Sequence, residues 1–379
     1  MTDSTIKLLC DLVAIDSVNP SLVPGGAGEA EIAGVVAAEL RSAGLDVEIT
    51  EVAPGRPNVV GVLNGRKPGK SLMLCGHIDT VGVERMDRPF DPIERDGKVF
   101  GRGAGDMKGG VAAMIEAARS LANSGGIKAG RLIVAAVADE EYASIGAEAL
   151  VKNWTADAAV VTEPTDLVIS IGHKGFSWVK ITTEGRAAHG SRPLEGRDAI
   201  LRMGRVLSRL EKLDAELQSR APHPVLGTGS LHGSLIEGGR ELSTYPDCCV
   251  LKIERRTITG ESGTVALAEV EEILSSLRDE DHEFEASAEA MFSRPSYETP
   301  GNHPLPSALE SALFQAGAKV HRAGMTYWTD AAVLGEAGIP SVIFGPGGGG
   351  YHGLEEYVHV DQVLTCRDAL VSLSREFCS

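Results

Sequence analysis

The sequence predicts an α/β protein into which a second, α+β domain is inserted. Helical patterns alternate with short, largely apolar strand patterns over residues 1–173. A different order of elements occupies residues 174–292, and the alternating pattern returns over residues 293–379. Buried strands that alternate with helices indicate a mixed sheet covered by helices on both faces. A length of 379 residues also exceeds what one ordinary core needs, so two domains are expected.

The elements of residues 1–173 follow from the spacing of apolar residues. Ile32, Val36 and Leu40 recur at helical intervals before Gly44, a residue type that ends helices. Further along, short apolar runs predict strands and one longer pattern predicts a helix. In order, these are strands at 58–63 and 71–75 joined through Asn64-Gly65, a helix at 109–123, and strands at 131–137 and 158–161.

The middle of the chain follows another order. It is expected to contain a strand at 176–182, a helix at 199–217, strands at 230–236 and 248–254, a helix with its apolar face between Val265 and Leu277, and a strand at 282–291. The order β-α-β-β-α-β is that of a ferredoxin-like domain. We therefore expect residues 174–292 to form this inserted domain.

The last part returns to the α/β style. Leu305, Leu309 and Leu313 predict a helix that ends near Gly317, and residues 339–344 predict one more buried strand.

Composition excludes several classes of partner and setting. The formal net charge of −17 argues against nucleic acid and against an anionic membrane, because binding either needs a basic surface. No stretch is long and apolar enough to span a bilayer, and the first residues do not have the pattern of a signal peptide. The six cysteines are scattered without metal-site spacing, as in a protein of a reducing compartment. A cytoplasmic location is expected.

Ionisable residues follow the ends of the expected strands, where ligands bind in open α/β sheets. His77 and Asp79 follow the strand at 71–75, Glu140 and Glu141 follow the strand at 131–137, and the remaining positions are Asp106 in a glycine-dense turn, Glu163 and His352. Histidines and carboxylates gathered at one sheet edge suit zinc or a similar cation. An acid shared between two ions lets five ligands hold a pair, and the surplus carboxylate at Glu140-Glu141 can then act as a base.

Taken in order, these segments resemble the zinc aminoacylase and carboxypeptidase family that includes acetylornithine deacetylase, succinyl-diaminopimelate desuccinylase and glutamate carboxypeptidase. The resemblance covers nearly the whole chain. It implies that His77 and Glu163 bind one metal, that Glu141 and His352 bind the other, and that Asp106 bridges both. It also implies that Asp79 orients His77 from behind and that Glu140 is the general base. The peptide after the bridging aspartate is typically cis in the family.

The inserted domain would be the family's lid and dimerisation domain, and residues 1–173 and 293–379 would form the catalytic domain. Within the lid, Gly185-Arg186-Ala187-Ala188-His189-Gly190 resembles the motif whose histidine stabilises the oxyanion, often across the dimer. Arg256 resembles the arginine that grips the substrate carboxylate. The glycine run 345–350, including Gly347, is expected to offer N–H groups to the same carboxylate, with a flexible turn as the alternative.

The sequence departs from the family pattern at one place and favours one branch of it at another. Ser243 stands near a position where many relatives carry asparagine, which leaves one substrate contact of the lid open. Glu163, rather than aspartate, resembles the deacylase branch more than the peptidase branch.

The expected activity is hydrolysis of the amide bond of an N-acyl amino acid or a short peptide that carries a carboxylate. Two zinc ions, or cobalt or manganese at the same ligands, would hold the attacking water between them. The alternatives are a dipeptidase or carboxypeptidase with the same dinuclear site, and a binding protein without catalysis. A dinucleotide-binding oxidoreductase is disfavoured because Gly101-Arg102-Gly103-Ala104-Gly105 does not directly follow a first apolar strand.

Overall fold

A computed structural model describes residues 3–379 of the chain, which divides into two compact units. Unit 1 comprises Met1–Gly172, Thr299–Gly324 and Thr329–Ser379, and unit 2 comprises His173–Glu298 and Met325–Trp328. By this division residues 293–298 belong with the inserted segment.

Unit 1 is built on a mixed central sheet. Its strands lie in the order β1-β2-β6-β3-β7-β15-β8, with β14 beside β8. The strand bounds are β1 Asp46–Ala53, β2 Arg56–Asn64, β3 Ser71–His77, β6 Arg131–Val137, β7 Ala158–Val161, β8 Ile169–His173, β14 Arg322–Met325 and β15 Ser341–Ile343. The neighbours β6, β3, β7 and β15 run parallel, whereas β1, β2 and β8 pair antiparallel with their neighbours. The carboxyl ends of β3, β6 and β7 therefore share one edge.

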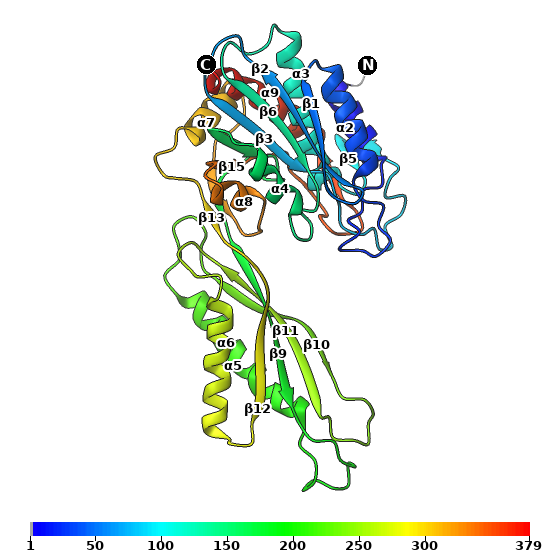
Figure 1. The fold of residues 1–379 in the computed structure, drawn as a ribbon, viewed down its shortest axis with the longest axis vertical. Helices are drawn as coiled ribbons and strands as arrows, with labels where there is room; N and C mark the ends of the chain where they lie inside the picture. Colours follow the sequence, from blue (N-terminus) through cyan, green and yellow to red (C-terminus); the bar gives the residue numbers. More distant parts are fainter. Residues whose placement is uncertain (1–2) are drawn as a thin grey trace. The chain divides into compact units, whose positions relative to one another are not determined.

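Helices cover both faces of this sheet, because alternate strand residues are buried on each side. Along β6, Leu132, Val134 and Ala136 join the large core shared with α1, α2, α3, α7 and α9, while Ile133 and Ala135 are equally buried on the other face. Figure 1 shows α3 and α9 on one side of the strands and α4 on the other. The helix bounds are α1 Ser4–Val13, α2 Ala30–Ser42, α3 Gly109–Asn123, α4 Ile145–Asn153, α7 Leu305–Gln315, α8 Ala331–Glu336 and α9 Val360–Phe377.

Unit 1 contains a small second sheet that includes two residues of the glycine run, Gly348 and Gly349. Its strand order is β16-β17-β5-β4, with bounds β4 Ile93–Arg95, β5 Lys98–Phe100, β16 Gly348–Gly349 and β17 Tyr357–His359. None of the helices formed by residues 3–379 is long and apolar enough to cross a membrane.

Unit 2 has the predicted ferredoxin-like arrangement. Its antiparallel sheet has the order β10-β11-β9-β12, and α5 and α6 pack on one face over Val179, Ile181 and Leu251. The bounds are β9 Gly175–Glu184, α5 Ala199–Ser219, β10 Ser230–Gly238, β11 Cys248–Thr257, α6 Val265–Glu280 and β12 Glu285–Arg294. The short strand β13 Tyr297–Glu298 is not part of this antiparallel sheet.

The α/β class with an inserted α+β domain is thus confirmed, and two details differ from a simple reading of the sequence. The strands joined through Asn64-Gly65 are not neighbours, because β6 lies between β2 and β3. The helices α1, α4, α8 and α9, and several strands including β1 and β8, had no counterpart among the predicted elements. Gly44 and Gly317 adopt φ of 85° and 75° just after α2 and α7, as residues that end helices do.

Candidate metal centre and active site

The candidate site lies at the edge of unit 1 where β3, β6 and β7 end. His77 is the last residue of β3, Glu140 and Glu141 follow β6, and Glu163 follows β7. Asp106 lies in the turn Ala104–Lys108, where its backbone is not helical, and its peptide bond to Met107 is cis. Parallel strands deliver these side chains to one place because their carboxyl ends coincide.

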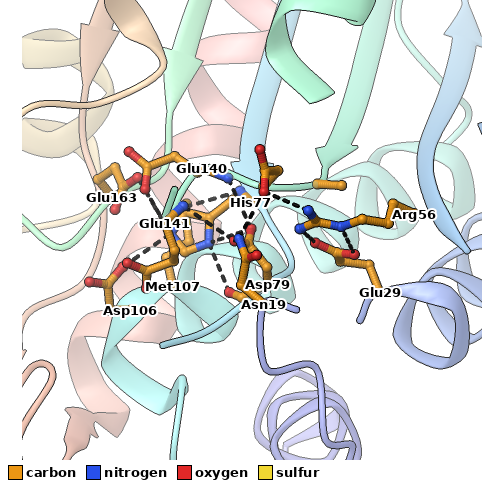
Figure 2. Close-up of polar contacts among 12 residues, drawn as sticks. Asn19, Glu29, Arg56, His77, Asp79, Asp106, Met107, Glu140, Glu141 and Glu163 are labelled. Carbon is orange, nitrogen blue, oxygen red and sulfur yellow. Dashed lines mark hydrogen bonds and ion pairs between the residues drawn. The ribbon is translucent and has the colours of Figure 1, made fainter. Parts of the chain in front are cut away.

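His77, Asp106 and Glu163 form one group of potential metal ligands. The Nε2 atom of His77 lies 3.1 Å from Oδ1 of Asp106 and 3.7 Å from Oε1 of Glu163. His77 and Glu163 are buried, so their polar atoms have little access to water. Figure 2 shows these side chains converging.

Asp106, Glu141 and His352 form a second group. The Nε2 atom of His352 lies 3.3 Å from Oδ2 of Asp106 and 3.3 Å from Oε2 of Glu141. Asp106 therefore turns one carboxylate oxygen to each histidine and belongs to both groups. Glu140 belongs to neither group, and its Oε2 lies 4.0 Å from His77 Nε2.

The turn that carries Asp106 is held by a buried glutamate from the last part of the chain. Oε1 of Glu356 accepts hydrogen bonds from the N–H groups of Gly105 and Asp106, both at 3.0 Å. Its Oε2 accepts from Gly103 N–H at 3.1 Å and from Arg102 Nη1 at 2.6 Å. Glu356 thus fixes the main chain that carries Asp106, the acid common to both groups.

Asp79 contacts both His77 and the segment after β6. The nearest acceptor to His77 Nδ1 is the main-chain oxygen of Asp79, at 3.0 Å, whereas the Asp79 carboxylate lies 3.5 Å away. That carboxylate instead accepts the N–H groups of Glu140 at 3.1 Å and Glu141 at 3.2 Å. Asp79 therefore ties the end of β3 to the segment after β6.

The ionisable groups show an excess of negative charge in a confined space. Burial, and then the charges of neighbouring carboxylates, raise the pKa of Glu140 and of Glu163 well above the usual value, against the opposing effect of His77. Burial and the charge of Asp106 raise the pKa of Glu141 to about 7. Hydrogen bonds to Asp106 and Glu141 raise the pKa of His352 to about 10.

This donor set fits two divalent cations. Among the described residues, Glu141 Oε1 and Glu163 Oε1 are buried and accept no hydrogen bond, and each belongs to a different group. Two ligand atoms about 2.1 Å from a common tetrahedral ion lie roughly 3.4 Å apart, close to the separations found here. A cation in each group would offset the carboxylate charge that burial makes costly.

The comparison with known families agrees with this arrangement. A sequence profile described as peptidase family M20/M25/M40 matches residues 73–376. The chain belongs to this family. It is accordingly an enzyme of the peptidase and amidohydrolase type, and the predicted family resemblance is confirmed.

Curated relatives of this M20 family member match over most of their length. An acetylornithine deacetylase from Vibrio atlanticus (strain LGP32) is 29% identical and covers 99% of this chain and 99% of its own. An N-formyl-4-amino-5-aminomethyl-2-methylpyrimidine deformylase from Bacillus subtilis (strain 168) is 28% identical and covers 91% of this chain and 88% of its own.

Solved structures share the fold. A tripeptidase from Staphylococcus aureus superposes with a TM-score of 0.83 at 21% identity, covering 99% of this chain and 98% of its own. A Bacillus subtilis dinuclear metal-binding peptidase of the M20 family has a TM-score of 0.74 at 18% identity, with 99% and 98% coverage.

The two lid residues expected in the site belong to unit 2 of this M20 chain. His189 is exposed after β9, and its Nδ1 lies 2.8 Å from Ser191 Oγ. Arg256 lies on β11, where its Nε donates to Glu254 at 2.6 Å and its guanidinium lies over the Phe176 ring.

Gly347 is placed differently from a free N–H donor. Its N–H donates to Gln362 Oε1 at 2.7 Å, and its oxygen accepts the N–H of His359. A β-carbon at this position would lie 1.6 Å from Asp166 Oδ1, so the backbone here is tightly packed. The contact of Gly347 with substrate stays a prediction, and so does the alternative of a flexible turn.

A set of buried polar residues behind the site was not predicted from the sequence. Asn19, Glu29, Arg56 and Asp139 are all buried and hydrogen-bonded to one another or to Asp79. The available signal was weak. Asp139 precedes Glu140-Glu141, and Arg56 lies two residues before the strand predicted at 58–63.

Proposed function

We propose that this M20 enzyme hydrolyses the amide bond of an N-acyl amino acid, as a deacetylase or desuccinylase does, with two metal ions in the site described above. The observation that carries the proposal is the placement of Asp106 between His77 and His352, with Glu163 and Glu141 completing one group on each side. Glu140 is left over as a carboxylate outside both groups, 4.0 Å from His77 Nε2.

Each residue then has a role that its chemistry suits. When bound, the metal pair supplies Lewis-acid polarisation of the amide carbonyl and a water that loses its proton near neutral pH. The Glu140 carboxylate accepts the proton of the attacking water and returns it to the nitrogen of the leaving amine. Asp79 and Glu356 hold the segments that carry Glu140, Glu141 and Asp106.

The choice of substrate rests on the relatives. The deacetylase and deformylase relatives both remove a small acyl group from nitrogen, according to their names, and they match nearly the whole chain. Dipeptidase or carboxypeptidase activity at the same site is the second candidate, since solved neighbours of this fold include a human carnosine dipeptidase. Zinc is the proposed metal, with cobalt or manganese as substitutes, because imidazole and carboxylate ligands accept all three.

We also propose that the enzyme works as a homodimer through the lid. Arg256 pairs with Phe176 near the start of β9, whereas His189 follows the other end of that strand and bridges to Thr244. Between Phe176 and Glu184 the strand rises roughly 26 Å, at about 3.3 Å per residue. A small substrate cannot touch both side chains of one lid, so a second copy would supply one of them, with His189 at the oxyanion and Arg256 at the carboxylate.

The proposed setting is the cytoplasm. All six cysteines are free thiols, which fits a reducing compartment.

The test is release of free amine from a panel of N-acetyl, N-formyl and N-succinyl amino acids and of dipeptides. The protein is loaded with zinc or cobalt and compared with a chelator-treated sample. Chelator-sensitive cleavage of one acyl class supports the proposal and names the acyl group. Cleavage of dipeptides alone would replace it with the peptidase alternative, and cleavage that persists without metal would contradict both.

A further inference from the structure

Arg56 forms a buried ion cluster beside the proposed site. It opens β2 and is 5% exposed, while its partners Glu29 and Asp139 are 0% and 1% exposed. Its Nε and Nη2 donate to the two oxygens of Glu29 at 2.8 Å and 2.5 Å, and its Nη1 donates to Asp139 Oδ1 at 2.6 Å. One guanidinium therefore binds two carboxylates, with a bidentate grip on the first.

The cluster continues from Asp139 to Asp79 through an amide. Asn19 Nδ2 donates to Asp139 Oδ1 at 3.0 Å and to Asp79 Oδ2 at 2.7 Å. Figure 2 shows Arg56 and Glu29 facing each other beside Asp79 and Asn19. The carboxylates of Asp139 and Asp79 are thus joined through one donor group.

The far end of the cluster is the backbone that carries the proposed base. The Asp79 carboxylate accepts the N–H groups of Glu140 and Glu141. Asp139 directly precedes them with φ of 70°, and its main-chain oxygen accepts N–H groups from Ala143 and Ser144. The N–H groups of Glu140 and Glu141 are therefore held by the Asp79 carboxylate, which Arg56 reaches through Asp139 and Asn19.

Charge explains why an arginine is needed here. Glu29, Asp139 and Asp79 add three buried carboxylates behind a site that already contains several. Burial would lower the pKa of Arg56, but the hydrogen bonds and charges of Glu29 and Asp139 raise it instead, so the guanidinium stays charged. Without it, Asp139 would be buried without its cation and would have to move or take up a proton.

We propose that Arg56 is a positioning residue for the metal-dependent hydrolysis proposed above: through Asp139, Asn19 and Asp79 it fixes the segment that places Glu140 as base and Glu141 as ligand. This inference rests on the proposed function, because one of its two readouts is hydrolytic activity. The other readout needs only a bound metal ion.

A buried arginine can also be merely structural, and the chain offers a matched control. Arg119 in α3 likewise bridges two carboxylates of unit 1, those of Glu116 and Glu39, and is 21% exposed, but no residue of the candidate site is among its partners. Arg56→Met and Arg119→Met both remove an ion-paired guanidinium and keep an apolar side chain of similar length.

The experiment compares the wild type, Arg56→Met and Arg119→Met as full-length, metal-loaded proteins. The first readout is kcat and KM per metal-loaded chain, on a substrate that the wild type cleaves. The second is the visible absorption spectrum of the cobalt-substituted protein, which reports ligand geometry without turnover.

For Arg56→Met we expect kcat to fall roughly 10- to 100-fold, the usual range for groups behind metal ligands, with KM changed less than about 3-fold and an altered cobalt spectrum. Arg119→Met should match the wild type in both readouts. The proposal is overturned if Arg56→Met also matches the wild type in kcat and in its cobalt spectrum.

Two further outcomes are a variant that does not fold and a wild type that cleaves no panel substrate. If Arg56→Met does not fold, Asp139→Asn replaces it, because asparagine keeps the size and tolerates positive φ while removing the charge that Arg56 neutralises. A loss of kcat of about 10-fold is then expected, and wild-type kcat overturns the proposal. If the wild type cleaves no panel substrate, the proposed function fails, and the cobalt spectrum alone decides the role of Arg56: an altered spectrum supports it and an unchanged one overturns it.

Discussion

Glu140 and Glu141 are adjacent in the sequence and serve different purposes in the proposed site. Glu141 joins the group with Asp106 and His352, whereas Glu140 stays outside both ligand groups. Substitution of Glu140 should therefore separate catalysis from metal binding. We expect Glu140→Gln to lower kcat by roughly 10²- to 10⁴-fold, the usual worth of a general base.

Two measurements check this separation together, namely amine release and the metal content of dialysed protein. Glu31→Gln, at an exposed position of α2, is the control. Equal loss of metal and activity in Glu140→Gln would show that Glu140 is a ligand rather than the base.

His352 gives a second prediction at the scale of one residue. Its side chain is 55% exposed, so its removal should not disturb the core. We expect His352→Ala to bind one metal ion per chain instead of two, because His77, Asp106 and Glu163 remain as a group. Elemental analysis against His282→Ala, an exposed histidine of unit 2, measures the difference. Retention of two ions would remove His352 from the ligand set.

Among the elements, β3 and β7 are joined at the edge opposite the site. Oδ2 of Asp157 accepts hydrogen bonds from the N–H and the hydroxyl of Ser71, both at 2.7 Å. The bond from the Ser71 N–H, followed by that from its hydroxyl, lowers the pKa of Asp157 below its usual 3.8. The ionised form therefore stabilises the start of both strands.

The sign of the resulting pH dependence follows from that lowered pKa. The contribution is fully present above the unfolded-state pKa and is lost as the pH falls through the lower, folded-state pKa. We expect Asp157→Asn to reduce the free energy of unfolding by about 1 kcal/mol near pH 6, with the difference shrinking as the pH is lowered to about 3. Urea unfolding at the two pH values checks this, and a difference independent of pH would be evidence against it.

Some helices and strands could be predicted from the sequence and others could not. The strands β3, β6 and β7 were predictable because each is a short apolar run, and the ligands follow because parallel strands end together. Helix α9 went unassigned although Val363, Cys366, Leu370 and Leu373 recur at helical spacing, so that signal was present. Helix α8, with six residues, is too short for periodicity to reveal.

The polar cluster behind the site was not predictable for another reason. Arg56 meets Asp139 because β2 lies beside β6, and Asn19 reaches Asp79 because Val18 bridges to Thr80. Neither neighbour relation follows from local pattern, since the strand order places β6 between two strands that are consecutive in the chain. The ligands that follow β3, β6 and β7 can be predicted from the ends of those strands. The polar cluster behind them depends on the order of the strands in the sheet.

For the whole molecule, the proposed dimer makes a prediction that two inactive variants can test. If His189 acts in the partner's site, a mixed dimer of His189→Ala and Glu140→Gln contains one site with both residues intact. Random mixing makes about half of the dimers mixed, so activity should recover to about a quarter of the wild-type value. Amine release before and after unfolding and refolding the mixture measures it. Activity that stays at the sum of the separate variants would place His189 in its own chain's site or outside catalysis.

A metal titration of the chelator-stripped protein tests the dinuclear site most directly, with bound metal and amine release measured on the same samples. We expect two ions to bind per chain, with hydrolysis absent from the stripped protein and restored as both groups fill. Full hydrolysis by the stripped protein would contradict this expectation. So would full activity with no ion bound in either group, neither at His77, Asp106 and Glu163 nor at Asp106, Glu141 and His352.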